Sequence, residues 1–201
     1  MKVGLYFGSF NPIHIGHLII ANHIANNTDV QEVWFIVSPQ NPFKPSNTLL
    51  NENHRLNLVR TAIESEKKLK ANNVEFKLPK PSFTVNTLAY LKEQYPQHEF
   101  AIIMGSDSFQ NLEKWKNAEI IIKNYDIYLY KRPGFEIKNN VNARIKIVDA
   151  PLLEISSTHI RKLIAENKSI RYLVTDDVKD EIEANHYYLS VLENPAKKKT
   201  T

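Results

Sequence analysis

The sequence predicts an open α/β sheet, mostly parallel, with helices on both faces. Short runs rich in Val, Ile, Leu and aromatic residues recur along the chain, and such runs are typical of buried parallel strands. Longer segments with apolar residues at helical spacing lie between them. Strands that alternate with helices in this way favour an α/β sheet, in which ligands bind beyond the carboxyl ends of the strands.

The first part of the chain alternates clearly between the two patterns. Residues 2–7 are rich in Val, Leu, Tyr and Phe and are expected to form a buried first strand. Apolar residues at helical spacing predict a helix over 15–26, and the run Val-Trp-Phe-Ile-Val predicts a central strand over 32–37. An amphipathic pattern predicts a helix over 53–69, and a short strand is expected at 74–77.

The second part continues the alternation. A helix is expected at 85–94, and the apolar run around two central isoleucines predicts a strand at 100–104. Another helix is expected to end near 120–122, before short strands at 127–130 and 145–148. Two final helices are expected at 157–165 and 177–187, the second capped by Thr-Asp-Asp at 175–177.

Length and charge favour one folded unit. A chain of 201 residues suits a single domain, expected over 1–190, with a disordered basic tail at 191–201. The formal net charge is +4, with 26 Lys and Arg against 22 Asp and Glu, but three of those lysines lie at 197–199. The rest of the chain is therefore near neutral and shows no basic stripe of the kind that binds nucleic acid.

Composition excludes several classes of protein. The chain has no cysteine, which excludes a disulfide scaffold, a thiolate metal site and a cysteine nucleophile. No run of about 18 apolar residues exists, so no transmembrane helix is expected. The first residues lack the features of a signal peptide. We therefore expect a cytoplasmic protein with no membrane partner.

The segment after the first strand has the character of an anion site. Residues 8–17 read Gly-Ser-Phe-Asn-Pro-Ile-His-Ile-Gly-His and open the next helix. His14 and His17 are three apart, so both imidazoles can point to one side of the helix start, and Gly16 removes the side chain between them. A helix N-terminus adds free N–H groups and partial positive charge, which suits a nucleoside triphosphate. Such a pair can also be two surface histidines or a metal site, although no third ligand lies nearby and His-Glu-x-x-His is absent.

A second anion-binding element lies near the other end of the chain. Residues 154–161 read Glu-Ile-Ser-Ser-Thr-His-Ile-Arg and precede a predicted helix. Ser156, Ser157 and Thr158 can cap that helix while its N–H groups hold an anion, and Arg161 can add a charge-assisted contact to phosphate. Taken alone, the segment is equally consistent with an ordinary N-cap followed by a surface arginine.

Together these motifs resemble a known group of enzymes. Residues 8–17 resemble the phosphate-binding motif of the nucleotidylyltransferase superfamily, and 155–161 resemble its second signature. Three middle segments resemble nicotinate-nucleotide adenylyltransferases in particular: Pro-Ser-Phe-Thr-x-x-Thr-Leu at 81–88, Gly-x-Asp with Leu-x-x-Trp within 105–115, and Arg-Pro-Gly at 132–134. The match spans the chain except its tail. Asn11 stands where many members carry aspartate, and Phe83 where tyrosine is common.

The resemblance implies a Rossmann-like fold and adenylyl transfer from ATP to nicotinate mononucleotide, giving deamido-NAD and pyrophosphate in NAD biosynthesis. It implies Mg²⁺ on the phosphates and no metal ligand from the protein. The catalytic residues it implies are His14, His17, Lys44 and Arg161. The ATP-binding residues it implies are Gly8, Ser9, Phe10, Gly16, Gly105, Asp107, Arg132, Ser157 and Thr158. The residues it implies for nicotinate mononucleotide are Asn11, Phe83, Thr84 and Trp115.

The chemistry of the acceptor agrees with these assignments. Nicotinate is a flat ring bearing a carboxylate, so Phe83 and Trp115 can stack on it, and backbone N–H groups at the helix start near Thr84 can bind the carboxylate. Core packing of both aromatic residues is the alternative. Asp107 is either a helix cap or a ligand contact, and Arg55 is either structural or directed at phosphate.

Other functions stay open at this point. Nicotinamide mononucleotide or 4'-phosphopantetheine could be the acceptor, and a non-catalytic nucleotide-binding sensor is the alternative from another class. The sequence leaves the oligomeric state open, a homo-oligomer included.

Overall fold

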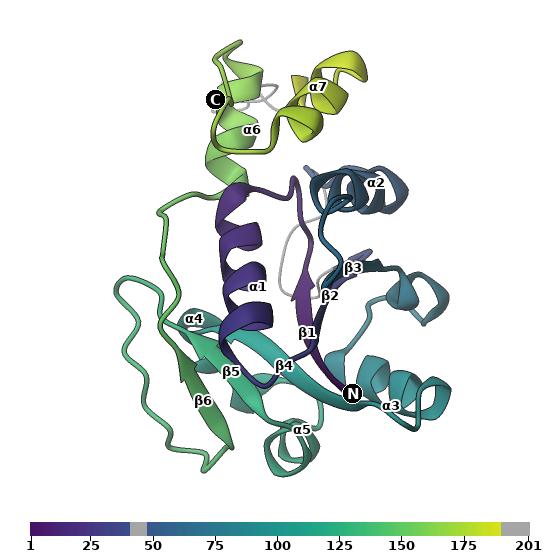
Figure 1. Cartoon of the computed structure of the whole chain (residues 1–201), viewed down its shortest axis with the longest axis vertical. Helices are drawn as coiled ribbons and strands as arrows, with labels where there is room; N and C mark the ends of the chain where they lie inside the picture. Colours follow the sequence, from purple (N-terminus) through teal and green to yellow (C-terminus); the bar gives the residue numbers. More distant parts are fainter. Residues whose placement is uncertain (41–47, 190–201) are drawn as a thin grey trace, which may run out of the picture.

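A computed structural model describes residues 1–40 and 48–189 of the chain (Figure 1). A six-stranded sheet with the order β3-β2-β1-β4-β5-β6 forms its centre, and every neighbouring pair is parallel. The strands are β1 (Lys2–Gly8), β2 (Glu32–Val37), β3 (Leu69–Asn72), β4 (Glu99–Gly105), β5 (Ile127–Tyr130) and β6 (Ile145–Val148). This order is that of Rossmann-like sheets, so the predicted fold class is confirmed.

Helices cover both faces of the sheet. The helical elements are α1 (Ile15–Asn27), α2 (Glu52–Ala62), η1 (Val74–Lys77), α3 (Thr84–Gln94), α4 (Ser106–Phe109), η2 (Leu112–Lys114), α5 (Ala118–Asn124), α6 (Ser157–Ala165) and α7 (Asp176–Ala184). Apolar residues of α1, α2, α6 and α7 join one core cluster with Tyr6. Those of α3 and α5 join a second cluster with Leu5, on the opposite face. Adjacent residues of a buried strand thus feed different cores, which explains why such strands read as continuous apolar runs.

Two expectations about the chain between β2 and α3 were wrong. The predicted helix over 53–69 ends at Ala62, and Leu69 begins an edge strand that pairs with β2. The Ile63 N–H bonds the carbonyl of Arg60, which tightens the chain into a turn and ends the helix. The predicted strand over 74–77 is the 3₁₀ helix η1, because the Asn72 side chain accepts a hydrogen bond from the Val74 N–H at 2.8 Å and turns the chain.

The last helix also differs from expectation at its end. It was expected over 177–187, but α7 ends at Ala184. His186 and Tyr188 adopt left-handed backbone conformations, with φ of 53° and 68°, which a continuing α-helix does not allow. Its predicted cap is confirmed, since the Thr175 side chain accepts from the Val178 N–H. The basic tail expected at 191–201 lies outside the described residues.

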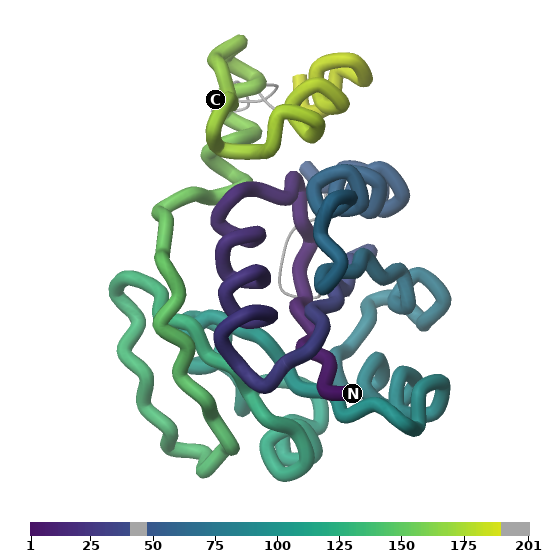
Figure 2. Tube along the Cα trace, in the orientation of Figure 1, coloured from purple at the N-terminus to yellow at the C-terminus, as the bar shows by residue number. Residues whose placement is uncertain are grey.

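The carboxyl ends of the strands face α6 and α7 (Figure 1). The chain runs from β6 alongside α1 to reach α6, as the tube in Figure 2 shows. The last helices therefore lie beyond the same edge at which the first strand opens into α1. Among the described residues, no helix has the length and apolar character needed to cross a membrane.

Candidate active site

The loop between β1 and α1 is shaped by an aromatic residue and a glycine. Phe10 is buried with its backbone in the left-handed region, at φ 45°, and its ring lies 5.1 Å from the ring of His17. A Cβ on Gly8 would come within 2.8 Å of the Phe10 ring. Gly8 therefore lets Phe10 fold back beneath the loop, where it supports His17 rather than contacting solvent.

The two predicted histidines lie together at the start of α1. Their rings stack with centroids 3.6 Å apart and an interplanar angle of 25°. The His14 backbone N–H donates to His17 Nδ1 at 3.3 Å, which leaves the proton of a neutral His17 ring on Nε2. A Cβ on Gly16 would come within 3.1 Å of His14 Nδ1, so glycine provides the room for this imidazole.

His14 is neutral at physiological pH. Burial, and then the positive charge of Arg132, lower its pKa from 6.5 to about 4. Its Nδ1 atom is buried and has no hydrogen-bond partner within the described chain. A buried polar atom without a partner is uncommon, and it is the kind of group that a ligand satisfies.

The second signature folds directly onto the first loop. Ser156 caps α6 by accepting from the His159 N–H. The Ser157 hydroxyl donates to the Pro12 carbonyl at 2.8 Å, across 145 residues of sequence. Arg161 donates to the Asn11 carbonyl at 2.7 Å and lies 3.4 Å from the Thr158 hydroxyl. The two predicted phosphate elements are thus brought together, with part of their hydrogen bonding used to hold the loop itself.

The segments after β4 and β5 contribute an ion pair. Arg132 Nε lies 3.8 Å from Asp107 Oδ1, and the Arg132 backbone N–H donates to the Ser106 hydroxyl at 2.8 Å. A Cβ on Gly105 would come too close to Asp107 Oδ1, so glycine leaves room for this carboxylate beside Arg132. Asp107 lies in the first turn of α4, and its carboxylate is the partner of Arg132. Arg132 lines a small hollow together with Tyr6, His14, His17, Tyr130 and residues 152–155.

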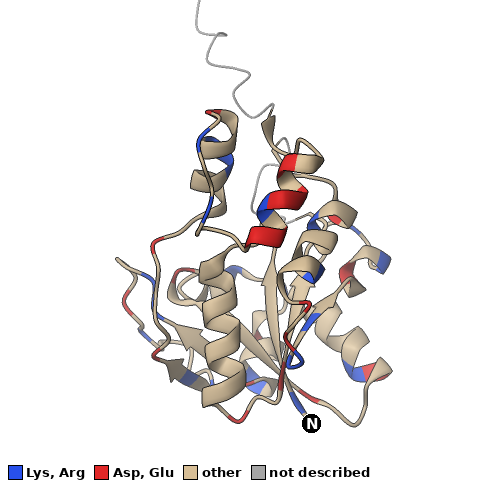
Figure 3. Ribbon diagram, turned by 45° about the horizontal axis from the view of Figure 1, so that its top comes forward, with Lys and Arg blue, Asp and Glu red and all other residues tan. Residues whose placement is uncertain are grey.

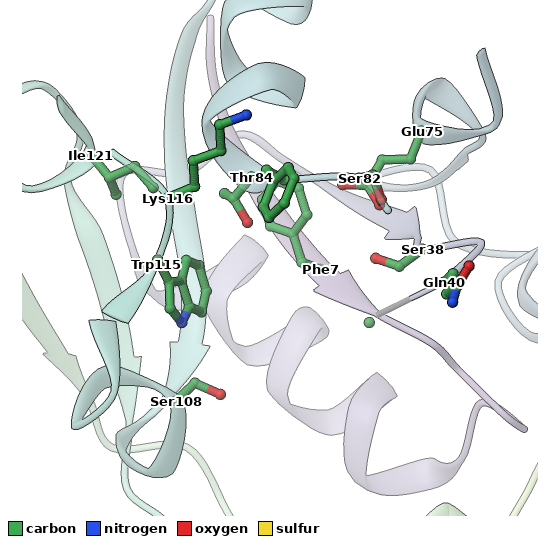
Figure 4. Close-up of a pocket in the computed structure, with 12 residues that line it drawn as sticks. Phe7, Ser38, Gln40, Glu75, Ser82, Thr84, Ser108, Trp115, Lys116 and Ile121 are labelled. Carbon is green, nitrogen blue, oxygen red and sulfur yellow. The ribbon is translucent and has the colours of Figure 1, made fainter. Parts of the chain in front are cut away.

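A second hollow has the end of β1 and Gly8 in its lining (Figure 4). Its volume is about 130 Å³. Three of the predicted acceptor-binding residues, Phe83, Thr84 and Trp115, line it together with Gly8. Phe83 and Trp115 are half-buried and also pack against the second core, so the core interpretation holds for both, and their contact with a ligand stays a prediction. The remaining lining residues are Phe7, Ser38, Gln40, Glu75, Ser82, Ser108, Lys116 and Ile121.

Asn11 sits away from that pocket. Its side-chain Nδ2 donates to the Thr48 carbonyl at 2.9 Å, and its side-chain Oδ1 accepts from the Leu50 N–H at 3.2 Å. The side chain thereby joins the loop after β1 to the chain before α2. Lys44 lies outside the described residues, so its predicted role stays a prediction.

Arg55 and Glu75 are buried residues that the sequence patterns did not assign to the site. Arg55 is fully buried and donates to the carbonyls of Leu50, Ser9, Ser38 and Pro39 at 2.7, 2.5, 2.8 and 3.1 Å. It is structural, and it fixes the loops after β1 and β2 to each other.

The Glu75 carboxylate accepts from the Ser82 hydroxyl at 2.6 Å and the Thr87 hydroxyl at 2.9 Å, which fixes the start of α3. The signal for Glu75 was a lone charge between apolar neighbours.

Comparison with known proteins identifies the family. The model of the cytidylyltransferase-like family matches residues 5–163. A probable nicotinate-nucleotide adenylyltransferase from Cytophaga hutchinsonii is 50% identical over 191 residues, which cover 94% of this chain and 98% of that protein. A relative with the same description from Flavobacterium johnsoniae is 49% identical, with 94% and 99% covered.

Solved structures agree on the fold. The nicotinic acid mononucleotide adenylyltransferase of Plasmodium falciparum, solved in complex with NaAD, superposes with a TM-score of 0.79 at 22% identity, covering 93% of this chain and 97% of that one. At such identity the likeness shows the fold, whereas the relatives near 50% identity show the family. This chain is therefore a member of the nicotinate-nucleotide adenylyltransferase family, within the cytidylyltransferase-like enzymes.

Proposed function

We propose that this chain transfers the adenylyl group of ATP to nicotinate mononucleotide, giving deamido-NAD and pyrophosphate. The observation that carries the proposal is a pair of hollows that both have residues of one loop in their linings. One is lined by Phe83, Thr84 and Trp115 and suits a flat aromatic acceptor. The other is lined by His14, His17 and Arg132 and suits phosphates. Gly8 belongs to the first hollow and Gly16 to the second, so the loop between them is where the reacting groups would meet.

The phosphate of the acceptor attacks the α-phosphorus of ATP in line, and pyrophosphate leaves. The acceptor phosphate is already an anion near neutral pH, so the reaction needs no strong general base. Catalysis then comes from positioning and from stabilising the charge that spreads over the phosphoryl oxygens. No covalent enzyme intermediate is formed.

Each predicted catalytic residue has a defined task in this scheme. His14 and His17 donate ring N–H groups to phosphate oxygens, and the neutral state of His14 gives it one donor without the cost of a buried charge. Arg161 adds charge beside the loop, with a buried Nε that has no partner among the described residues. Lys44 is assigned the same task by the sequence resemblance.

Mg²⁺ belongs to this proposal as a companion of ATP. The described residues contain no group of three or more His, Asp or Glu placed to hold a metal ion. Glu154 lines the hollow that His14, His17 and Arg132 also line, and Asp107 pairs with Arg132. This donor set fits an ion held by phosphate oxygens, where it would neutralise phosphate charge. The cytoplasmic location, the absence of nucleic-acid and membrane partners, and the oligomeric state stay open to experiment.

The acceptor is tested by direct competition between candidates. The protein is incubated with ATP and Mg²⁺ plus nicotinate mononucleotide, nicotinamide mononucleotide or 4'-phosphopantetheine, and pyrophosphate and the dinucleotide product are quantified. We expect the fastest pyrophosphate release with nicotinate mononucleotide, matched by deamido-NAD. Strong release with 4'-phosphopantetheine and none with nicotinate mononucleotide would overturn the proposal, and no release with any acceptor would favour a nucleotide sensor.

A further inference from the structure

The hollow lined by Phe83, Thr84 and Trp115 is called the acceptor pocket. Among the described residues that line it, the ionisable ones are Glu75 and Lys116. Glu75 is buried, and its two carboxylate oxygens accept hydrogen bonds from the hydroxyls of Ser82 and Thr87. Both donors are neutral, so the negative charge is solvated by the protein but is not cancelled. An acceptor that carries its own carboxylate would therefore enter a pocket with a like charge in its wall.

Lys116 brings the opposite charge to the pocket. Its ammonium lies 4.6 Å from the centroid of the Phe83 ring. Within the described chain it forms no ion pair, whereas nearby Lys114 donates to the Asn111 side chain at 2.9 Å. In Figure 4, Lys116 and Trp115 come from one wall of the pocket, and Ser82 and Glu75 from the opposite wall.

A ring that packs beside Phe83 would carry its substituent close to this ammonium. Contact of a cation with an exposed aromatic face is weak, so the lysine can leave Phe83 for a stronger partner. A carboxylate is such a partner because the hydrogen bond is then charged on both sides, while a neutral carboxamide offers no charge. We propose that Lys116 is a specificity-determining residue, whose ammonium favours an acceptor bearing a ring carboxylate over one bearing a carboxamide. This inference rests on the proposed function and assigns Lys116 a part in recognising the acceptor.

The test compares Lys116→Gln with Lys114→Gln. Both variants remove one exposed lysine charge from the same segment, but Lys114 does not line the pocket. For each protein, kcat/KM is measured with nicotinate mononucleotide and with nicotinamide mononucleotide at saturating ATP and Mg²⁺. Binding of each mononucleotide alone is measured by calorimetry.

We expect Lys116→Gln to lower the acid-to-amide ratio about tenfold, mainly through the KM and Kd for the acid. Lys114→Gln should keep the wild-type ratio, and Lys116→Arg should restore most of it. An unchanged ratio in Lys116→Gln, or an equal loss with both mononucleotides, overturns the role of Lys116. If the wild type forms no pyrophosphate yet binds the acid more tightly, the proposed function fails while calorimetry still decides the role of Lys116. If it binds neither mononucleotide, both ideas fail.

Discussion

Charged side chains are held in different ways at the two ends of the parallel strands. The amino edge is the end at which the strands begin, and the carboxyl edge is the end at which they stop. At the amino edge, the Lys2 ammonium lies 2.9, 3.1 and 3.0 Å from carboxylates of Asp29, Glu99 and Asp126. Lys146 shares two of these carboxylates. Burial alone would lower the pKa of Lys2, but its hydrogen bonds to carboxylates outweigh that effect and raise the pKa above its ordinary value.

The arginines at the carboxyl edge are paired mainly with backbone carbonyls rather than with carboxylates. Arg55 and Arg161 donate to backbone carbonyls, and their side chains form no ion pair within the described chain. Arg132 is the exception, with a long contact to Asp107. Charged ribbons of both signs surround the N-terminal end, while acidic residues gather on α7 (Figure 3). Carbonyls orient the Arg161 guanidinium without cancelling its charge, so this cation stays available to phosphates. Arg55 is fully buried and holds the loops instead. We therefore assign stability to the amino edge and propose binding for the carboxyl edge.

Arg55 gives the largest expected effect on stability. Arg55→Met leaves four carbonyls in a buried setting without their donor, so we expect a loss of about 3–5 kcal/mol in the free energy of unfolding. Chemical denaturation measures it, and Arg60→Met, an exposed arginine on the same helix, serves as the control with a change of under about 0.5 kcal/mol. Equal losses in both variants would show that the buried guanidinium does not hold the loops.

His14 predicts a pH dependence that belongs to the carboxyl edge. Its pKa is about 4 in the folded chain against the ordinary 6.5 in the unfolded chain, so below pH 6.5 the unfolded chain binds a proton that the folded chain does not. Stability therefore falls as the pH drops from 6.5 toward 4, by about 2 kcal/mol at pH 5 for this group. Denaturation at pH 7 and pH 5 checks this, with His14→Asn as the reference. A wild-type pH slope no steeper than that of the variant would contradict the buried neutral imidazole.

Lys2 is expected to give a smaller change at the amino edge. Lys2→Met leaves three carboxylates without their shared partner, two of them well exposed, so we expect a loss of about 1 kcal/mol. Pyrophosphate release should stay within about twofold of wild type because the residue lies at the far end of β1 from the site. The control is Lys67→Met, an exposed lysine outside the network. A loss of turnover in Lys2→Met without a loss of stability would contradict the assignment of the amino edge to stability.

Sequence patterns predicted the parts of the fold whose residues are buried on both faces. Strands β1, β2, β4 and β5 read as apolar runs, and their bounds were found within one or two residues. Strand β3 reads Leu-Lys-Ala-Asn and lies at the sheet edge, so its half-polar pattern was taken for the end of a helix. Strand β6 lies at the other edge and was predicted with its observed bounds, because Ile145, Ile147 and Val148 give it an apolar pattern. An edge strand without such a pattern is defined by its partner, which a local pattern does not contain.

The site was predictable to the extent that its residues lie in contiguous motifs. The loop at 8–17 and the segment at 154–161 were each visible, but the hydrogen bond from Ser157 to Pro12 depends on the folded chain. The burial of Arg55 and Glu75 was also hidden, because an isolated charged residue reads as exposed until its partners are known. Phe10 read as part of a ligand loop, and the structure shows it buried beneath that loop.

The most direct test compares single-turnover pyrophosphate release in His14→Asn and Lys2→Gln, together with their melting temperatures. Asparagine keeps the capacity to cap α1 and removes the imidazole, so the fold is expected to persist. We expect His14→Asn to slow release about 100-fold at a nearly unchanged melting temperature. Lys2→Gln should melt earlier and react at close to the wild-type rate. Release by His14→Asn within threefold of wild type would contradict the assignment of the carboxyl edge to the phosphates.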